Sequence, residues 1–237
     1  MQPLTEAQLS DYPLFENDPI VAISPVTGQG YCNHSYKVTT QTTAYLVRIL
    51  KQEGIDRDKE YVLQNQAADV GVAPGVILFD KERGAMISPF VEGVHHTRLD
   101  EEKLQNLATT LRRLHVTLVW EEAPLDLEQT IHSRTPSITK AFEMIRHYPA
   151  DLAVCHNDPN PQNILWQKDT PILIDFEFAG MSDRYFDLAA VCVEFGLDER
   201  MKRDFLDLYF EGSYSLEKVK AYEVLYRQLC KEWFSQR

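Results

Sequence analysis

The chain has 237 residues, of which 44% are hydrophobic and 25% are charged, and its formal net charge is −12 at pH 7. This length suits one large domain or two small lobes, and no apolar run approaches the ~20 residues that cross a bilayer, so we expect a globular protein without a membrane span. The acidic balance argues against a general nucleic-acid binder and suits a cationic substrate, or serves solubility alone.

The first half of the chain is rich in strand patterns. Strands are predicted at 19–23, 35–38, 44–50, 76–79 and 85–90, the last two as a hairpin around a charged turn. Residues 58–70 lack Gly and Pro and are followed by Gly71, which is typical of a helix and its end.

The second half becomes mainly helical after Gly93. Apolar residues between Leu104 and Leu114 recur at helical spacing and predict a helix over 100–115. Further predictions are a loop with a short helix at 120–136, a helix near 137–147, buried strands at 152–155 and 172–174, and three helices from about 186 onward. The sequence thus predicts an α+β protein with a strand-rich lobe at 1–91 and a helical lobe at 92–237.

The cysteines indicate in which cellular compartment the protein works. The four cysteines form no C-x-x-C pair, and no histidine cluster has zinc-site spacing. The N-terminus lacks the basic region and apolar core of a secretion signal. Scattered thiols without such a signal imply a reducing compartment, so we expect a cytoplasmic protein.

The segment from His156 to Glu177 holds the residue types that phosphoryl transfer needs. Asp158 lies in a loop between two short apolar runs, and Asn163 follows five residues later, so a tight loop can aim both side chains into one site. Asp175 ends the next apolar run. A carboxylate can orient an acceptor hydroxyl and take its proton, while Asn and Asp oxygens suit Mg²⁺. Each part alone is more common in turns, but together they predict a kinase-type site.

These residues also carry a family resemblance. Residues 155–165, 173–178 and 186–188 closely resemble choline/ethanolamine kinases, in the aminoglycoside-phosphotransferase-like branch of the protein-kinase-like fold. The resemblance covers about residues 20 to 210 and implies that fold, with two lobes. It also implies that Asp158 is the catalytic base and that Asn163 and Asp175 bind Mg²⁺.

Further roles in the loop and the ATP site follow from the same resemblance. His156 would support the catalytic loop and Asp187 would brace it. Arg48 looks like the strand cation that grips the α- and β-phosphates of ATP, and Glu60 looks like its partner on the next helix; arginine offers phosphate a permanently charged fork. The other ATP-binding residues implied are Gly28, Gly30 and Asn33 in a loop over the phosphates, and Ser88 and Phe90 in a hinge whose backbone would bind adenine.

Fewer residues indicate where the acceptor alcohol would bind. Glu194 matches a glutamate near the substrate of choline kinases, and Glu177 would touch metal or substrate, or remain a solvated turn carboxylate. Tyr185 and Phe195 are possible walls of the substrate site, since aromatic faces bind ammonium groups, although such residues are more often core.

We therefore expect a small-molecule kinase that uses ATP and Mg²⁺ to phosphorylate a small cationic alcohol, choline or ethanolamine first. Thiamine kinase, aminoglycoside phosphotransferase and an ATP-binding pseudokinase or partner module stay open. Choline kinases usually carry paired tryptophans that cage the ammonium on a further helix. This sequence has one tryptophan near its end, Trp233, with Tyr222, Tyr226 and Phe234 as other aromatic residues, so the acceptor is less defined than the phosphate chemistry.

Overall fold

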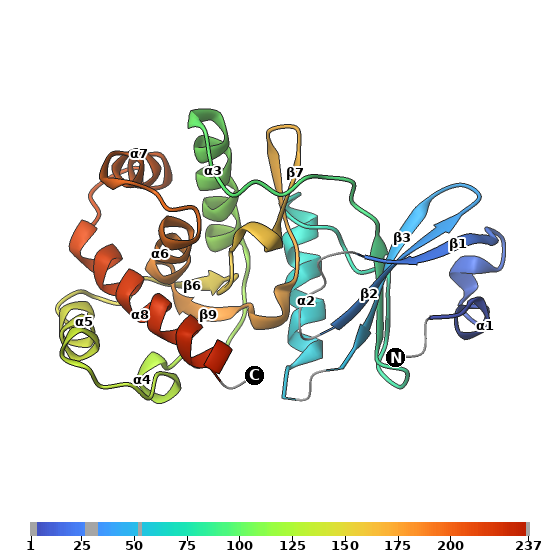
Figure 1. Ribbon diagram of the computed structural model, residues 1–237, viewed down its shortest axis with the longest axis horizontal. Helices are drawn as coiled ribbons and strands as arrows, with labels where there is room; N and C mark the ends of the chain where they lie inside the picture. The colour runs from blue at the N-terminus through green and yellow to red at the C-terminus, as the bar shows by residue number, and fades with distance from the viewer. Residues whose placement is uncertain (1–3, 27–32, 52–53, 236–237) are drawn as a thin grey trace.

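The computed structural model describes residues 4–26, 33–51 and 54–235 and consists of two lobes side by side (Figure 1). The smaller lobe is built on a sheet and the larger on helices, which confirms the predicted α+β class. Among the helices of these ranges, none combines the length and apolar character that a membrane crossing requires.

The smaller lobe is a five-stranded antiparallel sheet in the order β1-β2-β3-β5-β4. Its strands are β1 (Ile20–Pro25), β2 (Asn33–Thr40), β3 (Ala44–Leu50), β4 (Leu78–Asp80) and β5 (Ala85–Pro89). Val47 and Arg48 are neighbours on β3, so their side chains point to opposite faces. Val47 packs in an apolar cluster with Leu9 of the short helix α1 (Glu6–Leu9), whereas Arg48 pairs with groups of α2 on the other face.

Helix α2 (Arg57–Asp69) lies between the sheet and the helical lobe (Figure 1). Its Leu63 and Ala67 are fully buried in the large core of the helical lobe, not in the cluster of the sheet. Gln66 adds a polar tie, since its amide exchanges hydrogen bonds of 2.9 and 3.1 Å with the backbone of Val119. Helix α2 is therefore fixed to the larger lobe while its first turn reaches the sheet.

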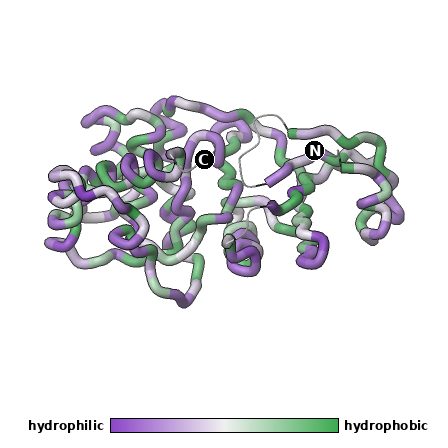
Figure 2. Tube along the Cα trace, turned by 60° about the horizontal axis from the view of Figure 1, so that its bottom comes forward, coloured by the Kyte–Doolittle hydropathy of each residue, from purple (hydrophilic) through white to green (hydrophobic). Residues whose placement is uncertain are grey.

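The larger lobe packs helices around one core. Its helices are α3 (Glu101–Thr117), α4 (Leu127–Thr130), α5 (Pro136–Arg146), α6 (Tyr185–Glu194), α7 (Glu199–Tyr209) and α8 (Leu216–Ser235), and its strands are β6 (Leu152–Cys155), β7 (Ile164–Gln167), β8 (Thr170–Leu173) and β9 (Gly180–Asp183). The strands pair as β6 with β9 and β7 with β8. Figure 2 shows hydrophilic and hydrophobic residues alternating along the helices, as amphipathic helices require.

Most predicted elements are present within a few residues of their predicted bounds, including the three C-terminal helices. Helix α1 and strand β9 had no counterpart in the prediction. Strand β9 reads Gly-Met-Ser-Asp, which has no run of strand-forming residues, and it exists because β6 supplies its hydrogen-bond partners.

The link between the lobes runs against β7. Val94 and Trp166 exchange backbone hydrogen bonds of 3.1 and 2.9 Å. A Cβ atom at Gly93 would lie 3.1 Å from the carbonyl oxygen of Trp166, which is closer than ordinary contact. Glycine permits this approach, so the crossing between the lobes is held close to the strand that follows the catalytic loop.

Helix α8 is anchored by a buried lysine near its start. Lys218 is 2% exposed, and its Nζ lies 2.6 Å from Asp183 Oδ2 and donates to the carbonyl oxygen of Pro149 at 2.9 Å. The same ammonium group lies 4.3 Å from the centre of the Tyr185 ring. A buried ion pair of this kind is costly to break from one side, because the remaining charge loses its partner.

We predict that Lys218→Met lowers the free energy of unfolding by about 2–4 kcal/mol, since Asp183 then keeps a buried charge without its cation. Lys220→Met is the matched control two residues along α8. Lys220 pairs with Glu199 where both side chains are about half exposed, so the change should be roughly 0.5 kcal/mol or less. Urea unfolding measures both, and equal losses in the two variants would contradict the anchor.

Candidate active site

The loop after β6 is shaped by its own polar side chains. Asn160 caps the turn Pro161–Asn163 by accepting the backbone N–H groups of Gln162 and Asn163, and its Nδ2 donates to Asp158 Oδ1 at 2.9 Å. Asn163 Nδ2 donates to Asp158 Oδ2 at 2.8 Å and to its carbonyl oxygen at 3.0 Å. Both carboxylate oxygens of Asp158 are thus held, and the amide oxygen of Asn163 is the atom left to face a cation.

Asp158 has the proton affinity of a base that works near neutral pH. Burial raises the pKa of its carboxyl to about 7; the hydrogen bond from Asn160 opposes this shift, and the charges of Asp175 and Glu194 add to it. A general base is most effective when its pKa lies near the working pH. The Asp158 carboxyl is therefore within electrostatic reach of Asp175 and of Glu194.

The raised pKa gives a prediction about stability. Since the folded protein binds the Asp158 proton more tightly than the unfolded chain, the folded state loses stability as pH rises from about 4 to about 7. Between pH 5 and pH 8, Asp158→Asn should gain ~1–3 kcal/mol in free energy of unfolding relative to the unmodified protein, because it has no charge to bury. A loss that is the same at both pH values is added, because the Asn amide cannot accept both hydrogen bonds from Asn160 and Asn163. Urea unfolding of the nucleotide-free protein at both pH values measures this difference.

The exposed Glu143 on α5 provides the control, because Glu143→Gln should give no such trend with pH. A difference between Asp158→Asn and the unmodified protein that is the same at pH 5 and pH 8 would show that burial does not set the proton affinity of Asp158.

Asp175 follows β8 in a conformation that few residues adopt. Its φ is +65°, in the left-handed region, where a non-glycine residue is strained, and such strain is concentrated at functional sites. The preceding Ile174 N–H donates to the carbonyl oxygen of Asn163 at 2.9 Å, which joins this loop to the catalytic loop. Burial raises the pKa of Asp175, although Arg48 opposes the shift. A set of Asp and Asn oxygens fits Mg²⁺, so the residues present suit this ion.

Arg48 and Glu60 form the predicted ion pair. Arg48 NH2 lies 2.6 Å from Glu60 Oε1, and Arg48 NH1 lies 3.1 Å from Asp175 Oδ1. One guanidinium group therefore connects the sheet, helix α2 and the turn from Asp175 to Phe178, which we call the metal loop because Asp175 is the predicted Mg²⁺ ligand. Gln64 accepts a further bond from Arg48 at 3.3 Å. Arg57 NH1 holds the other oxygen of Glu60 at 2.6 Å. Arg57 was not predicted as a site residue, although its i,i+3 spacing to Glu60 was a signal for this contact.

Asp187 braces the catalytic loop, as the family resemblance implied. Its Oδ2 and Oδ1 accept the backbone N–H groups of His156 and Asn157, both at 2.8 Å. His115 Nε2 lies 3.0 Å from Oδ2, so a residue of α3 supports the brace from behind. His115 was not predicted, because its partner is distant in sequence and a lone histidine on an apolar helix face carries no specific pattern.

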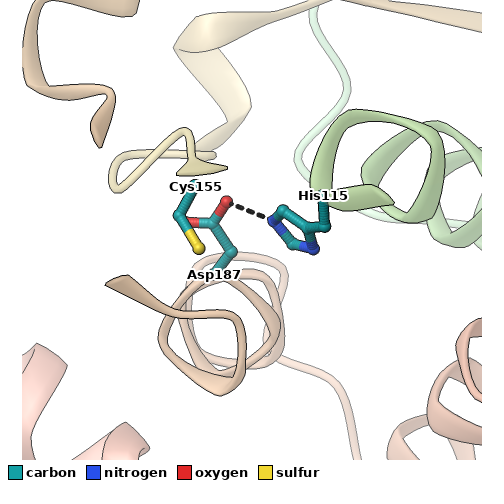
Figure 3. Close-up of side chains that lie close together, drawn as sticks. All are labelled: His115, Cys155 and Asp187. Carbon is teal, nitrogen blue, oxygen red and sulfur yellow. Dashed lines mark hydrogen bonds and ion pairs between the residues drawn. The ribbon is translucent and has the colours of Figure 1, made fainter. Parts of the chain in front are cut away.

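The side chains of His115, Cys155 and Asp187 lie close together, with possible ligand atoms within 4.8 Å of one another (Figure 3). The contacts favour a hydrogen-bonded brace over a metal centre. Both ring nitrogens of His115 are engaged, the second with Tyr209 Oη at 2.6 Å. Burial holds the pKa of the Cys155 thiol well above its usual range, so the thiol keeps its proton, whereas metals bind the thiolate.

Helix α8 places a side chain against Glu194, which was predicted to lie near the acceptor alcohol. Tyr226 Oη donates to Glu194 Oε1 at 3.1 Å. Burial raises the pKa of Tyr226, and the charge of Asp158 raises it further, so the phenol stays protonated and can donate. Tyr226 is therefore the aromatic residue of α8 that the structure associates with both Glu194 and Asp158.

The other residues predicted for the ATP site, and Glu177, lie in different parts of the structure. Gly28 and Gly30 lie outside the described residues. Ser88 is buried in β5, and the Phe90 N–H donates to the carbonyl oxygen of Ala44 at 2.9 Å, so this N–H is already engaged. Glu177 is 8% exposed, which excludes the solvated-turn alternative.

The structure does not bring Tyr185 to the acceptor residues. Its ring lies against Phe210 and the ammonium group of Lys218, and its hydroxyl accepts the Ser215 N–H. Phe195 is likewise buried in the core. Tyr185 and Phe195 are therefore core residues, which was the alternative given for both in the sequence analysis.

Taken together, the two lobes, the cation–glutamate pair and the Asp158 loop define a phosphotransferase with a kinase-like fold. The choline kinase LicA from Streptococcus pneumoniae has a similar structure, with a TM-score of 0.80 and 20% identity over 96% of this chain and 89% of that one. A choline/ethanolamine kinase family protein from Mesorhizobium loti gives a TM-score of 0.76 and 22% identity over 96% and 83%.

The chain belongs to the phosphotransferase enzyme family, whose pattern matches residues 24–222. By sequence it is similar to Protein LicA of Haemophilus influenzae, at 24% identity over 204 residues. That match covers 77% of this chain but only 60% of the LicA chain. The predicted resemblance to choline/ethanolamine kinases is confirmed: the chain is a member of a phosphotransferase family and shares the fold of those kinases.

Proposed function

We propose that this kinase transfers the γ-phosphoryl group of ATP to the hydroxyl of a small cationic alcohol, with choline or ethanolamine as the first candidates. The observation that carries the proposal is the position of Asp158. The charges of both Asp175 and Glu194 raise the pKa of its carboxyl, so the base lies within electrostatic reach of the proposed Mg²⁺ ligand and of the glutamate proposed for the cation.

The roles of the residues follow from these contacts. Asp158 orients the acceptor hydroxyl and accepts its proton as the oxygen attacks phosphorus. Asn163 and Asp175 would hold Mg²⁺, which offsets the charge of the phosphates when it is bound. Arg48 contributes a guanidinium to the phosphate tail, and Glu60 fixes the direction of that guanidinium.

The acceptor class follows from the charges beside Asp158. Glu194 is half-buried and accepts the Tyr226 hydroxyl, so a carboxylate and an aromatic ring lie together near the base. An ammonium group gains Coulomb attraction from the Glu194 carboxylate, which the Tyr226 hydroxyl holds in place. Relatives described as choline kinases support this choice of acceptor. The ATP supply that such an enzyme needs and its free thiols suit the cytoplasm.

A panel of acceptors tests the proposal directly. Coupled ADP release with choline, ethanolamine, thiamine and an aminoglycoside should show Mg²⁺-dependent turnover, fastest with one of the first two. Asp158→Ala should lower kcat by roughly 10²–10⁴, the usual range for loss of a general base. Turnover with only thiamine or the aminoglycoside would refute the acceptor, and nucleotide binding without transfer to any of the four would indicate a pseudokinase.

The cation site has its own prediction. Glu194→Gln removes the carboxylate but keeps its shape, so the KM for the cationic alcohol should rise about tenfold or more while kcat changes less. Tyr226→Phe removes the hydroxyl that holds Glu194 and should raise KM less, by about threefold. The KM for ATP is the internal control, and a rise in that value instead would place Glu194 on the nucleotide side.

A further inference from the structure

Three polar residues close a triangle of contacts beside Asp175. Arg57 NH2 donates to Asn33 Oδ1 at 3.0 Å, and Asn33 Nδ2 donates to Glu177 Oε2 at 3.1 Å. Arg57 NH1 lies 3.5 Å from the same oxygen of Glu177. The Arg57 and Glu177 side chains are 13% and 5% exposed, so water and salt screen this contact less than a surface pair.

The triangle joins three separate parts of the chain. Asn33 opens β2, Arg57 opens α2, and Glu177 lies in the short turn Phe176–Phe178 that follows Asp175. A cation at the start of α2 therefore lies against a carboxylate two residues beyond the proposed metal ligand.

Arg57 also completes an alternating row of charges. Asp175, Arg48, Glu60, Arg57 and Glu177 follow one another in contact, so three carboxylates face two guanidinium groups. The positive charge of Arg57 lowers the proton affinity of Asp175 as well, which shows that its field reaches the metal loop. Any divalent cation near Asp175 and Glu177 would share these carboxylates with Arg57.

We propose that Arg57 is a positioning residue that competes with the divalent cation for the Glu177 carboxylate and thereby sets how tightly the site binds that cation. The inference rests on the proposed Mg²⁺ site at Asp175. Asn33 keeps Glu177 in place through a neutral hydrogen bond, while Arg57 retains Glu60 as its stronger partner when Glu177 turns to the cation. Loss of Arg57 removes one competitor of the cation for the Glu177 carboxylate.

Mn²⁺ in place of Mg²⁺ provides a readout that is independent of activity. Free Mn²⁺ is counted by electron paramagnetic resonance during titration of the protein at a fixed, saturating concentration of ADP. Arg57→Gln should tighten Mn²⁺ binding about tenfold, because the Glu177 carboxylate no longer divides its charge between Arg57 and the cation. Glu177→Gln should weaken binding, and the double variant should match Glu177→Gln alone, because Arg57 acts through Glu177.

Lys59→Gln is the matched control. It removes a cation from the same turn of α2, but Lys59 pairs with Glu122, so Mn²⁺ binding should stay unchanged. If Arg57→Gln does not fold, Arg57→Lys keeps a charge beside Glu60 but cannot bridge three acceptors, and it should tighten binding by a smaller factor. Unchanged or weaker Mn²⁺ binding in the folded Arg57 variants would overturn the inference.

Asp175→Asn separates the two proposals. If this variant binds Mn²⁺ as well as the unmodified protein, the metal site itself is misplaced and the proposed function loses its support. If Asp175→Asn loses Mn²⁺ while Arg57→Gln has no effect, only the competition for Glu177 is refuted.

Discussion

The site depends on a guanidinium group that is almost removed from water. Arg48 is 7% exposed, and burying a charge costs several kcal/mol unless partners offset the loss of hydration. Glu60 and Asp175 supply that offset from α2 and from the loop after β8. Since neither partner lies on the sheet, the charge of β3 can be satisfied only when sheet, helix and metal loop come together.

This requirement explains why α2 is fixed to the helical lobe. Its Leu63 and Ala67 share the core of that lobe, and its Gln66 holds the backbone of Val119. Glu60 is therefore placed by the larger lobe and Arg48 by the smaller one. The ion pair between them is a contact between the lobes, and it aligns the phosphate side of the site with the catalytic loop.

Sequence patterns predicted what depends on near neighbours. The lack of Gly and Pro over residues 58–70 predicted the helix that carries Glu60, and the spacing from Asp158 to Asn163 predicted a loop that holds both side chains together. Residues whose partners are distant were missed. His115 finds Asp187 only when α3 and α6 pack together, and nothing in the sequence near His115 signals that contact.

Tyr185 and Tyr226 illustrate the same limit from the acceptor side. Tyr185 lies closer in sequence to the metal loop and was the predicted wall, but it packs on Lys218 at the start of α8. Tyr226, two turns further along that helix, contacts Glu194 instead. Which aromatic side chain reaches the site is decided by how α8 is anchored, and that anchor is the ion pair between Lys218 and Asp183.

The charged groups proposed for the phosphates and for the acceptor differ, and this difference bears on the proposed acceptor. On the phosphate side, Arg48 and Arg57 interleave with the carboxylates, as a site for a polyanion and its counter-ion requires. On the other side, Glu194 meets a protonated phenol, and the charge of Glu194 raises the pKa of Asp158. A cationic acceptor would relieve the repulsion between the Asp158 and Glu194 carboxylates as it binds. Its charge would lower the proton affinity of Asp158 only once the acceptor hydroxyl is in place. A neutral or anionic alcohol offers no such relief, and this difference is the electrostatic reason for proposing a cationic acceptor.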